Sequence, residues 1–155
     1  MNKKKILFVD DEQDILRVVT VTLEKYGYEI LTAVDGKEGL ERAANDKPDV
    51  ILLDKAMPIM DGREMLQRLR SAPDLKDIPV IMLTARCDPQ DITAVRPYNV
   101  SSYVTKPFDP TDLSNRIKDA LAEHKTAKQH SSMATADMIS KSAQGKGVLI
   151  NGKNS

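Results

Sequence analysis

The chain has 155 residues, of which 30% are charged and 41% hydrophobic, and its formal net charge is zero. This size and composition suit one globular domain, and no apolar run approaches the roughly 18 residues that a membrane-spanning helix needs. The balanced charge gives no general reason to expect nucleic acid as a partner. A single cysteine excludes a disulfide framework, and the first apolar run is too short for a signal peptide. We therefore predict a cytoplasmic protein with no membrane contact.

Charge and hydrophobic pattern change near residue 124. Residues 1–124 have 18 Lys and Arg against 22 Asp and Glu, a net charge of −4, and a strong hydrophobic rhythm. Residues 125–155 have five lysines against one aspartate, a net charge of +4, and are rich in Ser and Lys. We predict a domain over 1–124 and a tail over 125–155. The composition of the tail favours disorder, and a short partner-docking helix over 132–142 is the alternative.

Short apolar runs alternate with helical patterns along the domain. The runs have the length of strands and occur at 6–9, 28–33, 50–53, 79–84 and 102–105. The helical patterns that follow them begin at Asp14, Asp35-Gly36, Asp61-Gly62, Asp88-Pro89 and Asp109-Pro110. In the last two pairs, the aspartate is a predicted N-cap and the proline the first helical residue.

The first two helices have predicted ends. The first is expected to run to Tyr26, before Gly27, with Leu16, Leu23 and Tyr26 on its inner face. The second is expected to end at Ala44. Strands and helices in regular alternation predict an α/β fold, in which helices cover both faces of a parallel sheet.

Polar residues follow four of the predicted strands. Asp10 and Asp11 follow the first strand, Asp54 follows the third, Thr84 ends the fourth and Lys106 follows the fifth. Ligands of open parallel sheets bind beyond the carboxyl ends of the strands. We therefore expect these side chains to meet at one edge of the sheet.

These residue types together suit phosphoryl transfer. Three neighbouring carboxylates repel one another unless a cation holds them, and Mg²⁺ prefers oxygen ligands. Asp54 then provides the attacking oxygen, the lysine and the metal neutralise charge, and the hydroxyl adds a hydrogen bond. Each residue alone has an ordinary explanation as a helix cap, a strand residue or a solvated charge. Their coincidence at four strand ends favours the functional interpretation.

Four segments carry a family resemblance: "ILFVDDEQDIL", "VILLDKAMPIMDG", "PVIMLTA" and "SYVTKPFD". In this order they resemble the receiver domain of two-component response regulators, from about Lys4 to Glu123. The resemblance implies a flavodoxin-like, doubly wound (βα)5 parallel sheet with strand order 2-1-3-4-5.

The resemblance also implies the role of each site residue. Asp54 is the phosphoacceptor, and the phosphoryl group comes from the phosphohistidine of a sensor histidine kinase or a histidine phosphotransfer protein. Asp11 binds Mg²⁺ directly, Asp10 binds it mainly through water, and the backbone carbonyl of Ala56 supplies a further ligand.

The remaining roles concern the conformational change that the resemblance implies on phosphorylation. Lys106 pairs with the phosphoryl group, and the Lys106-Pro107 peptide bond is typically cis. The hydroxyl of Thr84 moves onto the phosphoryl group, and Tyr103 then turns inward. The fourth helix, fifth strand and fifth helix usually form the face that binds downstream proteins, and phosphorylation-dependent homodimers are a further expectation.

This sequence departs from the family pattern near that face. Pro97 falls where the fourth helix should continue, and we expect it to end the helix early. Asn99 stands where the family often has glycine, and asparagine tolerates the left-handed backbone of such a turn. Lys55 and Arg86 are expected to flank the pocket, either as modulators of dephosphorylation or partner choice or as solvated surface cations.

The leading interpretation is a stand-alone receiver that regulates partner proteins and does not bind DNA directly, because no output module is readable after residue 124. It is a signalling switch and not an enzyme. One alternative is a phosphatase of the haloacid dehalogenase type, but that family has a second aspartate where Ala56 stands and places its acidic pair after the lysine. A receiver-like binding module that has lost phosphorylation is the other alternative, and the intact site residues argue against it.

Overall fold

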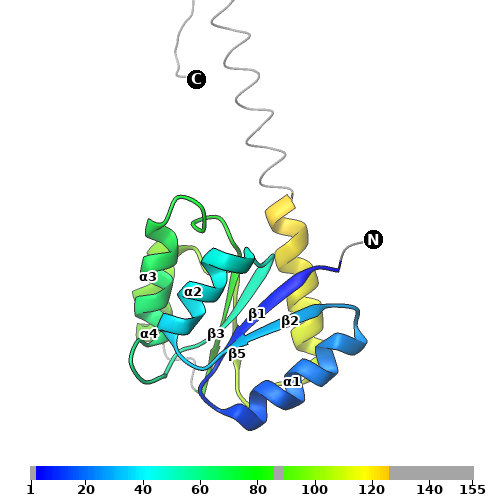
Figure 1. The fold of residues 1–155 in the computed structure, drawn as a ribbon. Helices are drawn as coiled ribbons and strands as arrows, with labels where there is room; N and C mark the ends of the chain where they lie inside the picture. The colour runs from blue at the N-terminus through cyan, green and yellow to red at the C-terminus, as the bar shows by residue number, and fades with distance from the viewer. Residues whose placement is uncertain (1–2, 86–88, 126–155) are drawn as a thin grey trace, which may run out of the picture. The chain divides into compact units, whose positions relative to one another are not determined.

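The computed structural model describes residues 3–85 and 89–125. The sheet belongs to a compact unit that ends at Leu121. Its strands are β1 (Lys5–Val9), β2 (Glu29–Ala33), β3 (Val50–Asp54), β4 (Val80–Thr84) and β5 (Ser102–Thr105). All pairs are parallel and the order is β2-β1-β3-β4-β5 (Figure 1). The predicted fold and strand order are thus confirmed.

Helices follow the strands in the predicted alternation. They are α1 (Gln13–Lys25), α2 (Gly36–Asp46), α3 (Gly62–Ser71), α4 (Pro89–Val95) with the 3-10 helix η1 (Arg96–Tyr98), and a last helix over 110–125. Two predicted ends were wrong. Helix α2 continues two residues beyond Ala44, and α1 ends before Tyr26, which is 42% exposed. The Tyr26 hydroxyl lies 3.2 Å from Thr111 Oγ1, so this ring closes over the start of the last helix instead of entering the core.

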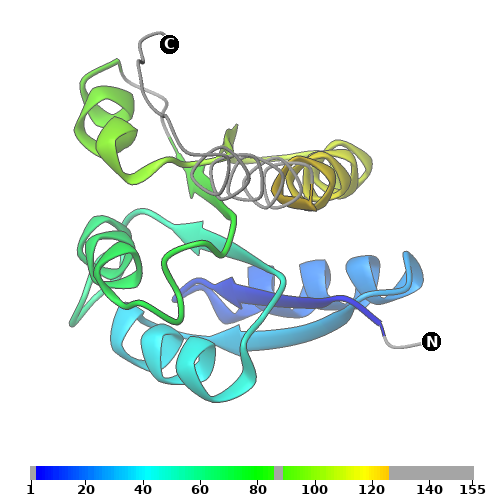
Figure 2. The same cartoon turned by 90° about the horizontal axis from the view of Figure 1, so that it is seen from above.

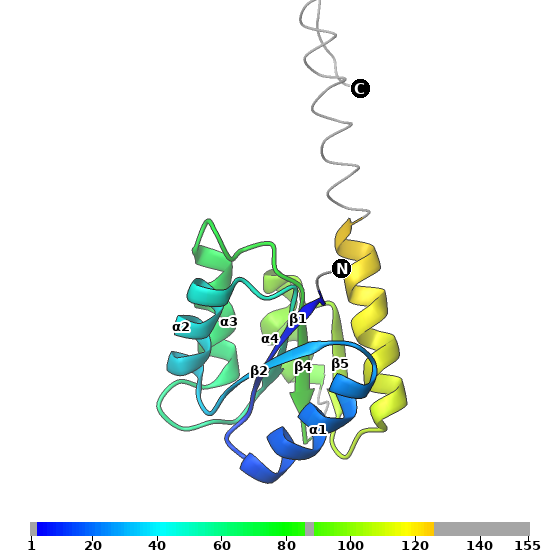
Figure 3. The ribbon, with the colours of Figure 1, turned by 45° about the vertical axis from the view of Figure 1, so that its right-hand side comes forward.

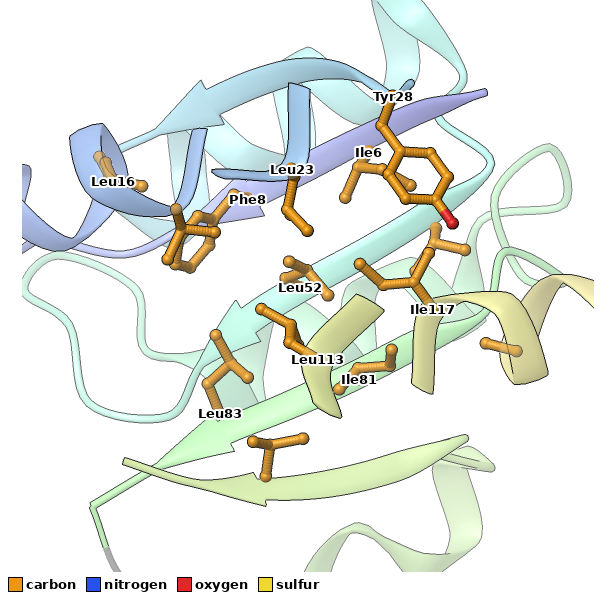
Figure 4. Close-up of a cluster of buried hydrophobic side chains, with 14 residues drawn as sticks. Ile6, Phe8, Leu16, Leu23, Tyr28, Leu52, Ile81, Leu83, Leu113 and Ile117 are labelled. Atoms are coloured by element: carbon orange, nitrogen blue, oxygen red, sulfur yellow. The ribbon is translucent and has the colours of Figure 1, made fainter. Parts of the chain in front are cut away.

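The helices cover both faces of the sheet (Figures 2 and 3). Side chains alternate along each strand, so Ile6 and Phe8 of β1 face α1 and the last helix, whereas Leu7 and Val9 face the side of α2 and α3. Figure 4 shows the first of these two clusters, in which Leu23 and Ile117 from the two helices lie over the strands. Burying each such side chain contributes about 1.5–3 kcal/mol, so the two layers fix the sheet and with it the strand ends.

Three aspartates cap helices in the structure, and of these only Asp109 was a predicted cap. Asp35 and Asp61 accept hydrogen bonds from the backbone N–H groups of Glu38 (2.8 Å) and Glu64 (2.9 Å). Asp109 accepts one from the Thr111 N–H at 3.2 Å. These side chains satisfy donors that the first helical turn leaves unpaired, so each helix begins where its aspartate stands. Pro89 begins α4 as expected, and its predicted cap, Asp88, lies outside the described residues.

Pro97 has the expected effect on the fourth helix. Helix α4 ends at Val95 and gives way to η1, which contains Pro97, and Asn99 then adopts a left-handed backbone with φ 56°. Both expectations for this segment are confirmed.

An arginine in the last turn of α3 binds the backbone of η1 and of the residue that follows it. The guanidinium of Arg70 donates to the carbonyl oxygens of Tyr98 (2.6 Å), Ile78 (2.7 Å) and Lys76 (2.8 Å), and to that of Asn99 (3.3 Å). These carbonyls precede β4 and β5, so Arg70 ties η1 to the amino-terminal edge of the sheet.

No helix in the described part of the chain combines the length and the apolar character that crossing a membrane requires.

Candidate functional site

The strand ladders bring the predicted site residues to the carboxyl edge of the sheet. Val9 pairs with Leu53, and Asp54 pairs with Leu83, so Asp10 and Asp54 leave neighbouring strands at nearly the same level. The ladders continue beyond the strands, because Asp10 N donates to Ala33 O (3.0 Å) and Lys106 N donates to Thr84 O (2.8 Å). Backbone hydrogen bonds therefore fix where these side chains start.

Lys106 joins three carboxylates at this edge. Its Nζ lies 2.7 Å from Asp10 Oδ2, 3.2 Å from Asp54 Oδ1 and 3.3 Å from Glu12 Oε1. Asp10 has no exposed surface and Asp54 is only 5% exposed, so one cation serves two buried acids. The other oxygen of Asp10 accepts from the Glu12 N–H at 2.9 Å.

Burial and charge change the proton affinities of this cluster. Desolvation, reinforced by the charges of Asp10 and Asp11, raises the pKa of Asp54 to about 6, although Lys106 opposes the change. Burial alone would lower the pKa of Lys106, but its hydrogen bond to Asp10 and the charge of Asp54 outweigh burial and raise it. The site thus holds a lysine that stays protonated beside a carboxylate whose charge is costly.

Three of these acids can share a cation. Carboxylate oxygens of Asp10, Asp11 and Asp54 lie within 4.8 Å of one another, and Asp11 is exposed to solvent. The donor set consists only of oxygen, and its negative charge exceeds what Lys106 neutralises, which fits a hard divalent cation such as Mg²⁺. Ala56 lies exposed in the loop directly after Asp54, and its role as a carbonyl ligand stays a prediction.

The loop between β3 and α3 packs tightly beneath Asp54. Gly62 N donates to Lys55 O at 2.9 Å, and a Cβ at Gly62 would overlap the carbonyl oxygen of Asp54 and lie 3.0 Å from Lys55 Cα. Ile59, at the loop tip, has φ 68° and is 79% exposed. Across the site, the Lys106-Pro107 bond is cis, as the resemblance implied.

The two predicted switch residues line one cavity. It has a volume of about 410 Å³, and Thr84, Tyr103, Ile92 and Val95 are among its walls. Thr84 is 6% exposed, and Tyr103 is half-buried with its hydroxyl donating to Ile92 O at 3.4 Å. The cavity therefore connects the carboxyl edge of the sheet to α4, and the movements assigned to Thr84 and Tyr103 stay predictions.

Two residues of this region were not predicted from the sequence. Glu12 contacts Lys106, and its position directly after the acidic pair was a signal that could have found it. Asp91 of α4 forms an ion pair of 2.5 Å with Lys55, and nothing in the local sequence indicates it. Lys55 lines the cavity as expected, whereas Arg86 lies outside the described residues.

Comparisons with known proteins agree with this site. Residues 6–118 match the family model of the response regulator receiver domain. The alkaline phosphatase synthesis transcriptional regulatory protein PhoP of Bacillus subtilis is 38% identical over 135 residues, which cover 87% of this chain and 55% of PhoP. The transcriptional regulatory protein PrrA of Mycobacterium tuberculosis is 34% identical over 149 residues, which cover 96% of this chain and 63% of PrrA.

Solved structures show the same fold over nearly their whole length. The chemotaxis protein CheY4 of Vibrio cholerae has a TM-score of 0.74 and 34% identity, and the match covers 77% of this chain and all of CheY4 (100%). A CheY-like receiver domain protein of Methanospirillum hungatei has a TM-score of 0.76 and 30% identity, covering 81% of this chain and 99% of the other.

The curated relatives are longer than this chain, which spans about half of their length, and those cited are transcriptional regulators by name. The predictions that the domain stands alone and does not bind DNA therefore stay predictions. The receiver fold, the strand-end acids with their lysine, and the family match over residues 6–118 lead to one assignment. The chain belongs to the response regulator receiver domains of two-component regulatory systems.

Proposed function

We propose that Asp54 accepts a phosphoryl group from the phosphohistidine of a sensor histidine kinase or a histidine phosphotransfer protein, in a reaction that depends on Mg²⁺. The observation that carries the proposal is the buried Asp54 carboxylate, 3.2 Å from the Lys106 amine and within one oxygen cluster with Asp10 and Asp11. The phosphorylated domain then regulates partner proteins through the region of α4, β5 and the last helix.

The proposed transfer is a displacement at phosphorus. An oxygen of Asp54 forms the new bond to phosphorus while the bond to the donor's imidazole nitrogen breaks, and that nitrogen keeps the electron pair. The Lys106 ammonium lies where negative charge gathers on the transferred group, so it stabilises the transition state. Asp10, Asp11, Asp54 and the carbonyl of Ala56 would hold the Mg²⁺, which supplies further charge neutralisation.

Protonation of Asp54 sets a limit on this reaction. Its pKa of about 6 means that a proton occupies the nucleophile in an increasing share of molecules as the pH falls below that value. A cation bound among the three acids favours the charged form of Asp54 and lowers this pKa. With Mg²⁺ bound, Asp54 would therefore be ionised at lower pH, and the charge of the transferred group would also be partly neutralised.

Labelling with a small phosphodonor tests the proposal. The protein is incubated with acetyl phosphate and Mg²⁺, and its intact mass is measured. We expect one added phosphoryl group on the wild type, none on Asp54→Asn, and one on the control Asp74→Asn, whose side chain is 83% exposed and remote from the strand-end site. Undiminished labelling of Asp54→Asn would contradict the assignment. A generic phosphate ester should not be turned over, because a receiver domain is a signalling switch.

A further inference from the structure

One ion pair joins the residue after the phosphoacceptor to the fourth helix. Lys55 Nζ lies 2.5 Å from Asp91 Oδ2, and the two side chains are 41% and 35% exposed. Lys55 N donates to Leu83 O (3.0 Å) and Lys55 O accepts from Gly62 N (2.9 Å), so its backbone is held from two sides. The side chain is therefore the part of Lys55 that can change partner.

The strand pattern explains why Lys55 reaches α4. Its backbone hydrogen bond extends the β3 ladder by one residue, so the alternation of side chains still applies to it. Leu53 points to the face that Val95 of α4 covers, and Lys55 follows two residues later on that same face. Lys55 and Asp91 both line the cavity that contains Thr84 and Tyr103.

Within residues 3–85 and 89–125, helix α4 has few other anchors near its first turn. It has seven residues, of which only Val95, at its far end, is buried. The Tyr103 hydroxyl reaches Ile92 O at 3.4 Å, and the Asp91 side chain reaches Lys55. Among the described contacts of the first turn of α4, the ion pair is thus the one that reaches the residue after Asp54.

We propose that Asp91 is a positioning residue for the phosphorylation site and acts through Lys55. In the unphosphorylated domain Asp91 holds the Lys55 ammonium against α4. When Asp54 carries a phosphoryl group, that group competes with Asp91 for the ammonium, and the first turn of α4 loses this anchor. The inference rests on the proposed function, since it requires a phosphoryl group on Asp54.

Charge and position support this competition. Strand alternation directs the Lys55 side chain away from that of Asp54, but Lys55 lines the same cavity as Thr84, the hydroxyl proposed to contact the phosphoryl group, and a lysine carries its charge on a flexible four-carbon stem. A phosphoryl group adds negative charge and three strong acceptor oxygens, whereas Asp91 offers one partly exposed carboxylate. Partly exposed ion pairs are weak, so a second anion close by is enough to divide the lysine between two partners.

The competition can be measured as a change in affinity for a phosphoryl mimic. If the ion pair with Asp91 keeps Lys55 away from the site, Asp91→Asn should bind the mimic beryllofluoride, with Mg²⁺ present, about two- to fivefold more tightly than the wild type. Lys55→Met should bind it more weakly by a similar factor, and Lys55→Arg should retain the affinity of the wild type. In the Lys55→Met background, Asp91→Asn should change nothing further. Fluorine NMR titration measures these affinities.

A matched control separates this mechanism from a general effect of charge. Asp74→Asn removes the same charge from a more exposed pair, Asp74 with Lys47 at 3.6 Å, and should leave the affinity unchanged. An unchanged affinity for beryllofluoride in Asp91→Asn would overturn the inference. It would also be overturned if Asp91→Asn raised the affinity as much in the Lys55→Met background as in the wild type. Failure of the wild type to bind beryllofluoride would overturn the proposed function and the inference with it. Binding by the wild type without the Asp91 effect overturns the inference alone.

Discussion

Lys106 Nζ lies 2.7 Å from Oδ2 of Asp10, a carboxylate with no exposed surface. A buried charge that loses its partner typically costs about 3–5 kcal/mol. We therefore expect Lys106→Met to lower the free energy of unfolding by about 3 kcal/mol at neutral pH, measured by urea denaturation without metal. Lys118→Met, at an exposed position of the last helix, should change it by less than about 0.5 kcal/mol. Adding Asp10→Asn to Lys106→Met should restore part of the loss, and equal effects of the two lysine changes would contradict this account.

The raised pKa of Asp54 predicts a dependence of stability on pH. The folded domain binds this proton with a pKa of about 6, against an ordinary value of 3.8, so folding favours the protonated form. The resulting stabilisation is complete below pH 3.8 and is lost as the pH rises through 6. Without metal, Asp54→Asn should therefore be more stable than the wild type at pH 7, by about 2 kcal/mol, and nearly equal to it at pH 4. Thermal melts at both pH values check this, and a constant difference would argue against it.

Gly62 is predicted to be indispensable beneath Asp54. A Cβ there would meet backbone atoms of Asp54 and Lys55, which the β3 ladder holds in place. We expect Gly62→Ala to destabilise the domain by about 3 kcal/mol and to slow labelling by acetyl phosphate. Gly27→Ala is the control: Gly27 has φ 92° but open space around it, so the change should cost about 1 kcal/mol and leave labelling intact. Normal labelling and stability of Gly62→Ala would show that the loop can rearrange.

Ile59 offers a stabilising substitution. A β-branched residue with φ 68° pays a steric cost, and this side chain is 79% exposed and recovers little by burial. Ile59→Asn should raise the free energy of unfolding by about 1 kcal/mol, because asparagine tolerates the left-handed region. Chemical denaturation measures the gain. The substitution Ile59→Val keeps the β-branch and should give none, so an equal gain from both would refute the backbone explanation.

Much of this architecture could be predicted because the hydrophobic pattern along the sequence is enough to locate the ends of the strands. Apolar runs of strand length, together with parallel order, bring Asp10, Asp54 and Lys106 to one edge without any knowledge of side-chain conformation. The early end of α4 at Pro97 and the left-handed Asn99 follow equally from single residues with strong backbone preferences.

The contacts that escaped prediction depend on how helices are rotated over the sheet. Asp91 reaches Lys55, and Tyr26 turns outward to Thr111, because of the direction in which each helix presents its side chains. The left-handed Ile59 was also missed, since no local preference of isoleucine indicates it. Contacts and backbone conformations of this kind are determined by the packing of helices and loops on the sheet.

The clamp of Arg70 on the carbonyls of Tyr98 and Asn99 determines how α4 can move. It fixes the far end of the helix to the amino-terminal edge of the sheet, so residues 98–99 serve as a fulcrum and the helix as a lever arm. At a rise of about 1.5 Å per residue, Asp91 lies roughly 10 Å along that arm, so a tilt of about 10° carries it by roughly 2 Å. A tilt about this point would therefore displace the first turn of α4 most, and the Lys55–Asp91 ion pair is one of the described contacts that oppose it.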